Sequence, residues 1–566
     1  MLFILLSWLY ILAISSVIGV TINKVLQLKK QDSIITILFG FFGVTLMASI
    51  WAIPFAINAY FHVFLLFFTG VLGYLNYKFI LAYCLQLKTE IAALTVFFKI
   101  LLSCIALLIL AQSASPPFVI DNESYYIQTI KWLNEYGFVN GLVNLHVFLG
   151  QTSGWHILQS AFNFNFIYSY FNDLSALALL LGNVYAIFKL HAFLSKKDTH
   201  ISNLIFGFFP LWNLFFFPFI SAPSPDIAIY VLGNILLHQF VLCFATYSKP
   251  AFITVVIFSF FMAFIKLSAV PFCIFSLVLY KRYFIFTKST TSILMVFGGI
   301  TLVLFSIKNI IITGNLFFPL QGIESLKTSW SLPENIETYF ANYTKPYAYH
   351  LTAQAFENAS YFTKLKSWLL APRLHGIFNK VILFLLVVFP FFIYKSQNKK
   401  AFYTIYMVAI ISMLFLFVTS PQYRFFFPFI LCFSLVLVSK IITHKNSIKI
   451  VVVISTVLAA IPLFFKVNNA AISNNKQLAV SSTFSSEYIV KPYKNSKYSE
   501  KYKSILLNET TIHTPTEVDF FWGTGDIPLP ALQQEQLDFF KSHFQVIPQQ
   551  RTKHLKDGFI SKKFQQ

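Results

Sequence analysis

Residues 2–22 read LFILLSWLYILAISSVIGVTI, a run without a single charged side chain. At a rise of about 1.5 Å per residue, about 20 apolar residues in a helix cross the hydrocarbon core of a membrane. The run lacks the basic leading segment and the small-residue cleavage site of a secretory signal, and charges such as Lys24 and Lys30 follow it. We therefore expect a retained membrane-spanning helix whose N-terminus lies outside the cytoplasm.

Comparable apolar runs recur along the whole chain. We expect about 14 transmembrane helices, at 2–22, 34–57, 61–83, 91–112, 172–194, 201–220, 226–247, 250–266, 268–283, 292–312, 377–395, 400–420, 424–443 and 448–466. The two short runs between 250 and 283 could also form one re-entrant or broken segment. The chain of 566 residues is 57% hydrophobic and only 11% charged, which excludes an ordinary soluble protein and a disordered one. The expected fold class is an all-α polytopic integral membrane protein.

The formal net charge of +21 is explained by topology rather than by nucleic-acid binding. When loops are assigned alternately to the two sides, one set holds 16 Lys and Arg residues against three acids, Asp32, Glu90 and Asp198. Lys and Arg accumulate in cytoplasmic loops, so we expect this set to be cytoplasmic and both termini to lie outside. These loops are short and the chain has no GxxxxGK[ST] motif, which argues against ATP-driven transport by this chain.

The larger polar segments fall on the expected outer side. They are an outer loop at 113–171, a second outer loop at 313–376 and a tail at 467–566, between groups of helices at 1–112, 172–312 and 377–466. The tail contains apolar and aromatic clusters, so we expect a small extracytoplasmic domain.

The first outer loop holds the clearest candidate site. It reads PPFVIDNESYYIQTIKWLNEYG from residue 116 to 137, with Ile127, Ile130 and Leu133 at helical spacing. This pattern predicts an amphipathic helix at the membrane interface that ends at Gly137. Asp121 and Glu123 precede it, either as capping and dipole-compensating acids or, for Asp121, as a general base or a metal ligand.

Aromatic and polar side chains in the same loop suit the binding of sugar rings. They are Tyr125, Tyr126, Asn144, His146 and His156. Such residues equally suit an ordered, turn-rich loop that packs on helices, and each histidine alone more often has a structural role.

Several cations stand at the expected outer ends of helices, against the usual charge distribution. They are Lys266, Lys308, Arg373 and Arg424. A cation at this depth is costly without a partner, and a lipid-linked phosphate is one such partner. The alternative is that they extend to lipid headgroups or pair with acids such as Asp173, Asp226 or Glu324, which we favour for Lys266.

The acid at the start of an amphipathic outer-face helix in a many-span chain resembles the GT-C superfamily of membrane glycosyltransferases. The residues from Asp121 to Trp132, followed by Glu135-Tyr136-Gly137, Asn144-Leu145-His146 and Leu149-Gly150, look like an uncharacterised family of bacterial polytopic proteins with GT-C-like architecture. Two features depart from these patterns: the acidic loop follows the fourth span rather than the first, and Tyr126 stands where the narrower family would place histidine.

The resemblance implies an enzyme of the bacterial cytoplasmic (inner) membrane that uses a polyprenyl-phosphate sugar donor and a glycan acceptor on the outer face. Asp121, aided by Glu123 or a divalent cation, would deprotonate the acceptor, and Arg424, Lys308 and Arg373 would bind the donor phosphate. A polymerase or ligase of surface polysaccharide is an alternative. A flippase or transporter is another, but we expect ionisable residues near the membrane midplane in that class, where His238 stands nearly alone.

Overall fold

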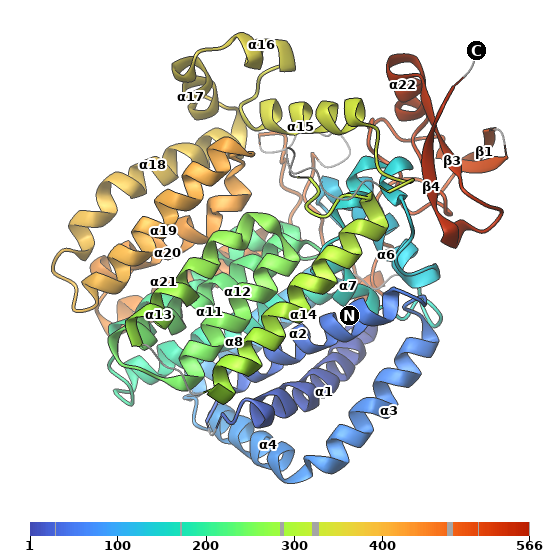
Figure 1. The fold of residues 1–566 in the computed structure, drawn as a ribbon. Coiled ribbons are helices and arrows are strands. Elements are labelled where there is room, and N and C mark those ends of the chain that lie inside the picture. The colour runs from blue at the N-terminus through green and yellow to red at the C-terminus, as the bar shows by residue number, and fades with distance from the viewer. Residues whose placement is uncertain are drawn as a thin grey trace.

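Helices dominate the computed structural model, which describes residues 1–28, 30–169, 173–283, 288–319, 328–471, 479–507 and 509–564 (Figure 1). Over these residues, 11 helical segments are long and apolar enough to cross a membrane. They are α1 (Leu2–Val25), α2 (Ser33–Ala52), α5 (Val96–Ser113), α8 (Leu174–Leu194), the interrupted segment Ile201–Phe219, α11 (Pro225–Ala245), α14 (Lys288–Thr313), α18 (Arg373–Ile393), α19 (Lys399–Val418), α20 (Tyr423–Ile441) and α21 (Lys445–Phe464). The chain is therefore an all-α, multi-pass membrane protein, as its composition predicted.

The count of spans differs from the 14 expected. Helices α3 (Ala59–Leu75) and α4 (Tyr77–Ala92) meet at a 90° bend, and counting them as one span raises the total to 12. At the bend, the Asn76 amide donates to the Leu72 carbonyl at 2.9 Å and accepts a hydrogen bond from Lys24 at 2.8 Å, which explains why a continuous helix does not form there. Helix α12 (Lys249–Ile265) is too short for the criterion. The run at 268–283 is divided between the 3₁₀ helix η6 (Leu267–Phe272), which contains Pro271, and α13 (Cys273–Tyr283).

The interrupted segment shows how proline acts within an apolar run. It consists of α9 (Ile201–Gly207), η4 (Phe209–Trp212), α10 (Asn213–Phe216) and η5 (Phe217–Phe219). Pro210 and Pro218 lie in its two 3₁₀ turns, where each removes a backbone donor from the helical ladder.

Burial separates central helices from peripheral ones. In the most apolar window of α11, 89% of the residues are buried, against 28% for α14 and 33% for α21. A peripheral helix with an exposed apolar surface is the form expected of a helix that faces lipid. The central position of α11 matters because its first turn carries Asp226.

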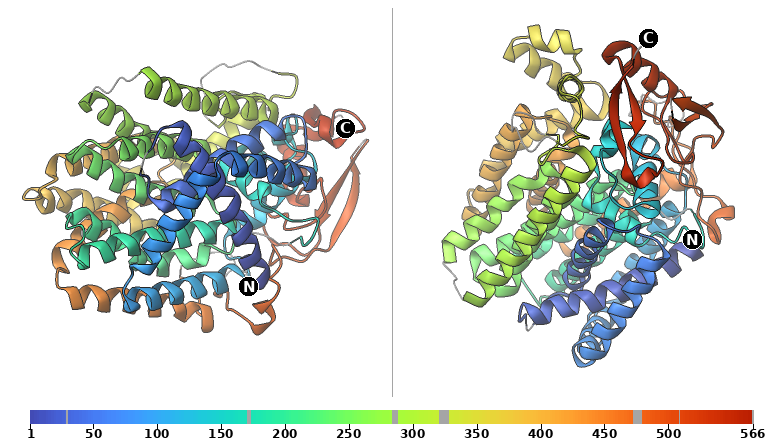
Figure 2. Two further views of the ribbon diagram at one scale, coloured as in Figure 1. Left: turned by 90° about the horizontal axis from the view of Figure 1, so that it is seen from below. Right: turned by 45° about the vertical axis from the view of Figure 1, so that its right-hand side comes forward.

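One end of the helix bundle is covered by polar segments, and we call it the capped end. These segments contain the short helices α6 (Ile127–Glu135), α7 (Gly154–Ala161), α15 (Glu334–Ala348), α16 (Ala353–Asn358) and α17 (Tyr361–Leu369), together with η1 (Asn122–Tyr126), η2 (Leu142–Asn144) and η3 (Val147–Gln151). The chain begins at this end, because the Phe3 amide donates to the Val490 carbonyl of the C-terminal segment at 3.2 Å. Both termini therefore lie at the same end of the bundle (Figures 1 and 2).

The C-terminal segment carries the strands of the described chain. Strand β1 (Tyr502–Leu507) pairs antiparallel with β2 (Thr510–Pro515), and β3 (Val546–Gln550) pairs antiparallel with β4 (Phe559–Lys563). Helix α22 (Gln534–Phe544) and the 3₁₀ turns η8 (Ser486–Ile489) and η9 (Leu555–Asp557) complete it. The pair β3–β4 stands beside α6, as Figure 2 shows, and the Phe559 amide donates to the Asn140 carbonyl at 2.9 Å.

The predicted helix in the first loop is confirmed as α6. It is followed by Gly137, whose φ of +73° is a left-handed conformation and whose Cβ, if present, would lie 2.2 Å from the Phe55 carbonyl oxygen. The helix does not lie open at an interface, however. Its polar residues Gln128, Thr129 and Asn134 are buried as well as its apolar ones, and Gln128 donates to the Gly525 and Ile527 carbonyls of the C-terminal segment, which covers the face that the sequence pattern left for solvent.

Candidate functional site

The centre of the candidate site is an ion pair between residues that are 303 positions apart in the sequence. Arg424 Nη1 donates to Asp121 Oδ2 at 2.5 Å. Asp121 precedes η1 and its side chain makes no capping hydrogen bond with that helix. Arg424 is the second residue of α20, and its Nε donates to Gln422 Oε1 at 2.9 Å. Asp121 therefore does not act as the local cap considered from the sequence, and its partner instead comes from across the molecule.

A second ion pair adjoins the first. Lys266, between α12 and η6, donates to Asp226 Oδ1, and Asp226 Oδ2 lies 4.0 Å from Arg424 Nη1. The pairing of Lys266 with an acid is confirmed, and the acid is one of the three named as alternatives. Asp226 itself was not among the predicted site residues, although an acid directly after Pro225 at the start of an apolar run is a recognisable signal.

The four charged groups balance one another. Asp121 and Asp226 each have a cation in contact. Within the described chain, no group of three or more His, Cys, Asp or Glu side chains is placed to hold a metal ion. The described residues therefore do not form the site for a divalent cation that was considered from the sequence.

Tyrosines and a histidine line one side of the Asp121–Arg424 pair. Tyr126 Oη donates to Asp121 Oδ2 at 3.5 Å, and its ring centroid lies 4.7 Å from that of His156. The Tyr125 ring lies 6.0 Å from His156. His156 is fully buried, and neither of its nitrogens has a hydrogen-bond partner among the residues that the structure describes; burial and the nearby Lys308 and Lys266 lower its pKa to about 3. The imidazole is therefore neutral.

Lys308 lies beside this group, in α14. Its ammonium donates to the Thr152 carbonyl at 2.6 Å and lies 4.9 Å from the centre of the Phe305 ring. The side chain is 4% exposed, and no carboxylate of the described residues lies within ion-pair distance of it. The structure thus brings five predicted residues together with the pair Asp226–Lys266: Asp121, Tyr125, Tyr126, His156 and Arg424, with Lys308 at the margin.

The Glu123 carboxylate points elsewhere. It accepts hydrogen bonds from Ser496 Oγ and, at 3.0 Å, from the Lys497 amide, while its backbone carbonyl accepts from Thr524 and Gly525, both at 2.9 Å. The residue is fully buried, and burial raises the pKa of Glu123 to about 7. Glu123 holds the C-terminal segment onto the loop, so the structure separates it from Asp121 despite their spacing.

Asn144 and His146 also contact the polar segments of the capped end rather than the two ion pairs. Asn144 donates to the Trp330 carbonyl and accepts from Ser561 Oγ, both at 2.8 Å. His146 Nε2 lies 3.3 Å from the Trp522 carbonyl, and burial lowers the pKa of His146 to about 4. Both residues join the first loop to later segments, which is the structural role left open for them.

Two histidines that the sequence did not single out lie near Tyr423, the residue before Arg424. His375, in the first turn of α18, has its ring centroid 5.1 Å from that of Tyr423 and 5.0 Å from that of His350. Arg373, a predicted phosphate ligand, lies two residues before His375 and has a φ of +62°. It makes no ion pair with a described residue, and its buried Nη1 has no hydrogen-bond partner among them. Neither histidine stands in a motif or a charge pattern, so only the fold places them together.

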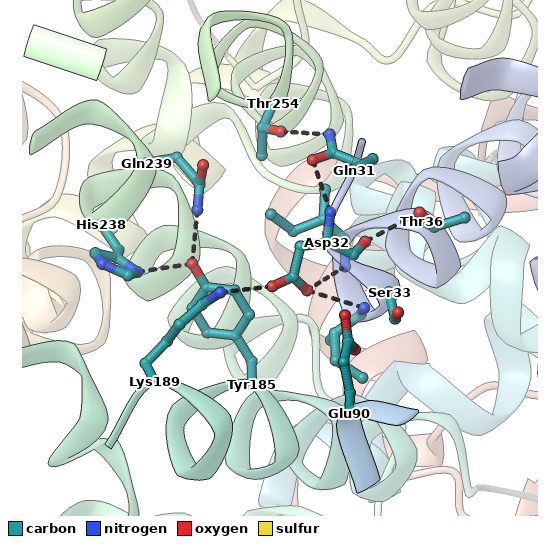
Figure 3. Close-up of polar contacts among 12 residues, drawn as sticks. Gln31, Asp32, Ser33, Thr36, Glu90, Tyr185, Lys189, His238, Gln239 and Thr254 are labelled. Atoms are coloured by element: carbon teal, nitrogen blue, oxygen red, sulfur yellow. Dashed lines mark hydrogen bonds and ion pairs between the residues drawn. The ribbon is translucent and has the colours of Figure 1, made fainter. Parts of the chain in front are cut away.

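A separate polar cluster lies near the opposite end of the bundle (Figure 3). Lys189 donates to Asp32 Oδ2 at 2.7 Å, and Asp32 also caps α2 by accepting from the Ile34 amide at 3.0 Å. Tyr185 Oη lies 2.7 Å from His238 Nδ1 and accepts from Gln239 at 2.7 Å. His238 is thus hydrogen-bonded to the neighbouring helix α8, and the expectation that it stands nearly alone is wrong, because Tyr185 of α8 and Gln239 of α11 form a network with it.

A family model described as "Domain of unknown function (DUF8201)" matches residues 1–431, which include every residue of both ion pairs. No curated protein and no solved structure matches the chain.

Proposed function

We propose that this chain, which belongs to the family of the domain of unknown function DUF8201, is a membrane glycosyltransferase. It moves a sugar from a polyprenyl-phosphate-linked donor to a lipid-linked or surface glycan acceptor. The observation that carries the proposal is the meeting of Asp121 and Arg424 at the capped end, beside buried tyrosines and a neutral histidine. An acid and a phosphate-binding guanidinium in one place are the two groups that this transfer requires.

The reaction follows from the chemistry of these groups. The acceptor hydroxyl oxygen attacks the anomeric carbon of the donor, the bond between that carbon and the phosphate oxygen breaks, and the phosphate leaves with the bonding electrons. Asp121 accepts the hydroxyl proton, and Arg424 stabilises the negative charge on the leaving phosphate. A donor phosphate competes with Asp121 for the Arg424 guanidinium, so donor binding itself frees the carboxylate to act as the base.

The neighbouring groups position the pair. Asp226 lies 4.0 Å from Arg424 and keeps the guanidinium in place when Asp121 releases it. Tyr126 donates to the same carboxylate oxygen of Asp121 that Arg424 contacts. Lys308 adds positive charge beside His156, and Arg373 adds it at the start of α18. The neutral His156 and the two tyrosines offer hydrogen-bonding and stacking surfaces for a sugar.

The proposal places the capped end on the outer side of the bacterial cytoplasmic membrane. A lipid-linked donor reaches the site laterally through the bilayer, so no soluble nucleotide-sugar domain is needed. Both termini then lie outside, and the lysine-rich loops lie in the cytoplasm.

Mass spectrometry of lipid-linked and surface glycans from a deletion strain tests the reaction class. The expected result is a glycan that lacks one sugar residue and regains it when the wild-type gene is restored. Unchanged glycans would contradict the proposal. Accumulation of complete lipid-linked units would favour a polymerase, a ligase or a flippase instead.

One observation favours transport as the second candidate. The cluster of Asp32, Lys189, Tyr185 and His238 places ionisable side chains inside the helix bundle, as transporters do. In this cluster Asp32 and Lys189 neutralise each other, whereas Lys308, His156 and Arg373 at the capped end have no acidic partner among the described residues. We therefore place the transfer chemistry at the capped end and give the opposite cluster a structural role.

A further inference from the structure

An open pocket lies between the start of the first loop and the C-terminal segment. Its volume is about 590 Å³, within the range of about 300–1,000 Å³ that is usual for small-molecule sites. Pro116 of the first loop forms one part of its wall, and residues between Val480 and Glu517 form the rest. No residue of the two ion pairs lines this pocket, so it is separate from the site described above.

Hydroxyl groups dominate the wall of the pocket. Of the eleven lining residues, five are serine or threonine and two are tyrosine, and four of them lie within residues 481–485. Over the described ranges of the chain, the hydroxyl groups of Thr483, Tyr488 and Tyr493 form no hydrogen bond with protein. A hydroxyl group can both donate and accept a hydrogen bond, so this wall suits a ligand whose own groups do the same.

The two tyrosines are held in place by backbone hydrogen bonds. Their ring centroids lie 5.7 Å apart, with the rings nearly perpendicular. The Tyr493 amide donates to the Ala114 carbonyl at 2.9 Å, and the Tyr488 carbonyl accepts a hydrogen bond from the ammonium group of Met1. Tyrosine rings offer rigid apolar faces together with a polar hydroxyl group, which are the surfaces that a sugar ring contacts.

The charged residues of the wall argue against a polyanion. Glu517 and Lys497 line the pocket, and Glu517 is paired with Lys501 at 2.8 Å. Lys497 makes no ion pair with a described residue, and the wall contains no arginine. A single uncommitted ammonium group is little to hold a phosphate, whereas its three donors suit sugar hydroxyl groups well.

We infer that this pocket binds a saccharide, with sugar rings against Tyr488 and Tyr493 and sugar hydroxyl groups on the serines and threonine of residues 481–485. The inference rests on the proposed function only where it identifies the saccharide as the glycan acceptor. Two contacts support that identification. Pro116 precedes Asp121 in the same loop, and the Lys497 amide donates to the Glu123 carboxylate at 3.0 Å.

The test uses the full-length protein in nanodiscs and oligosaccharides released by mild acid from the surface glycans of cells that carry this chain. Saturation-transfer difference NMR should detect at least one of these oligosaccharides bound to the wild type. The triple variant Thr483→Val/Tyr488→Phe/Tyr493→Phe should bind it at least about tenfold more weakly, because three hydrogen-bonding groups are lost while the shape of the pocket is kept. The matched control is Tyr502→Phe, which removes an exposed tyrosine hydroxyl outside the pocket and should behave like the wild type.

Several results would overturn the inference. These are the absence of binding by any released oligosaccharide, undiminished binding by the triple variant, and displacement of the oligosaccharide by tripolyphosphate, which would indicate an anion site. If the triple variant does not fold, Thr483→Trp decides. The indole fills the pocket and should abolish binding, and retained binding would show that the saccharide lies elsewhere.

Failure of this site and failure of the proposed function are distinguishable. Unchanged glycans in a deletion strain would refute the transferase, yet binding that depends on Thr483, Tyr488 and Tyr493 would still establish the saccharide site. Full sugar transfer by a triple variant that no longer binds the oligosaccharide would refute its identification as the acceptor and leave the transferase standing.

Discussion

Asp121 owes its position to a guanidinium from α20, 303 residues away in the sequence. The sequence placed Asp121 and Glu123 together at the start of a predicted helix, with Asp121 as the candidate base and Glu123 as an aid to it. The structure distinguishes them by their partners: Arg424 for the first, Ser496 and the Lys497 amide for the second. The local sequence pattern predicted that both acids lie next to a helix, but their different partners depend on contacts with residues far away in the sequence.

At the residue scale, Glu123 predicts how stability depends on pH. Burial raises its pKa from 4.5 in an exposed chain to about 7, so the folded state holds the proton more tightly than the unfolded state between these values. The stabilising contribution is complete below about pH 4.5 and is lost as the pH rises through about 7. As the pH rises over this range, the C-terminal segment should be held less tightly to the first loop. Faster hydrogen exchange of the amides in β1–β4 would measure this change.

The variant Glu123→Gln is compared with Glu509→Gln. Glu509 is an exposed acid of the C-terminal segment. Glutamine at position 123 cannot ionise, so exchange should no longer depend on pH over this range beyond the intrinsic chemical rate. The Glu509 variant should keep the wild-type profile. An unchanged profile in the Glu123 variant would show that another group titrates.

At the scale of elements, long apolar runs predicted most of the long helices, and the helical spacing of apolar residues predicted α6. Both patterns are local in the sequence. It did not predict the 90° bend at Asn76, where one amide side chain bonds to Leu72, Thr21 and Lys24 in place of a continuous helix. It also did not predict that the outward face of α6 would be buried. That burial depends on a segment nearly 400 residues later, whose Gly525 and Ile527 carbonyls accept from Gln128.

The second prediction concerns the ion pair between Asp32, which caps α2, and Lys189 of α8. Lys189→Met leaves the largely buried Asp32 without its cation and should destabilise the protein by about 2 kcal/mol. Asp32→Asn together with Lys189→Met should cost less than the sum of the two single changes, because asparagine can still cap α2. Thermal unfolding in detergent micelles of the four proteins gives the coupling energy.

Lys197→Met is the control, since Lys197 is exposed just beyond the end of α8. It should leave stability within about 0.5 kcal/mol of the wild type. Strictly additive costs for Asp32 and Lys189 would mean that the ion pair does not join the two helices.

At the scale of the whole molecule, the alternation of charged and uncharged loops agrees with a bundle whose two chain termini lie at one end. The small sheets and the fold of the C-terminal segment were not predictable in detail, because their pairing depends on contacts with the first loop. The contact between His350 and His375 could not be predicted either, because it joins the segment after α15 to the first turn of α18.

The third prediction concerns sidedness. In a cysteine-free background, Glu509→Cys at the capped end should react with a membrane-impermeant maleimide on intact cells. Gln397→Cys, between α18 and α19 at the opposite end, should react only after the membrane is permeabilised. The reverse pattern would place the capped end in the cytoplasm and would remove the basis for a lipid-linked donor on the outer face.

The most direct test of the central claim is complementation of the deletion strain with Asp121→Asn, followed by mass spectrometry of its glycans. A general base contributes about 10²–10⁴-fold to rate, so the variant should fold and reach the membrane yet leave the glycan one sugar short. Asp519→Asn, an exposed acid of the C-terminal segment, should restore the sugar fully. Full restoration by Asp121→Asn at wild-type abundance would contradict the assignment of Asp121 as the catalytic base.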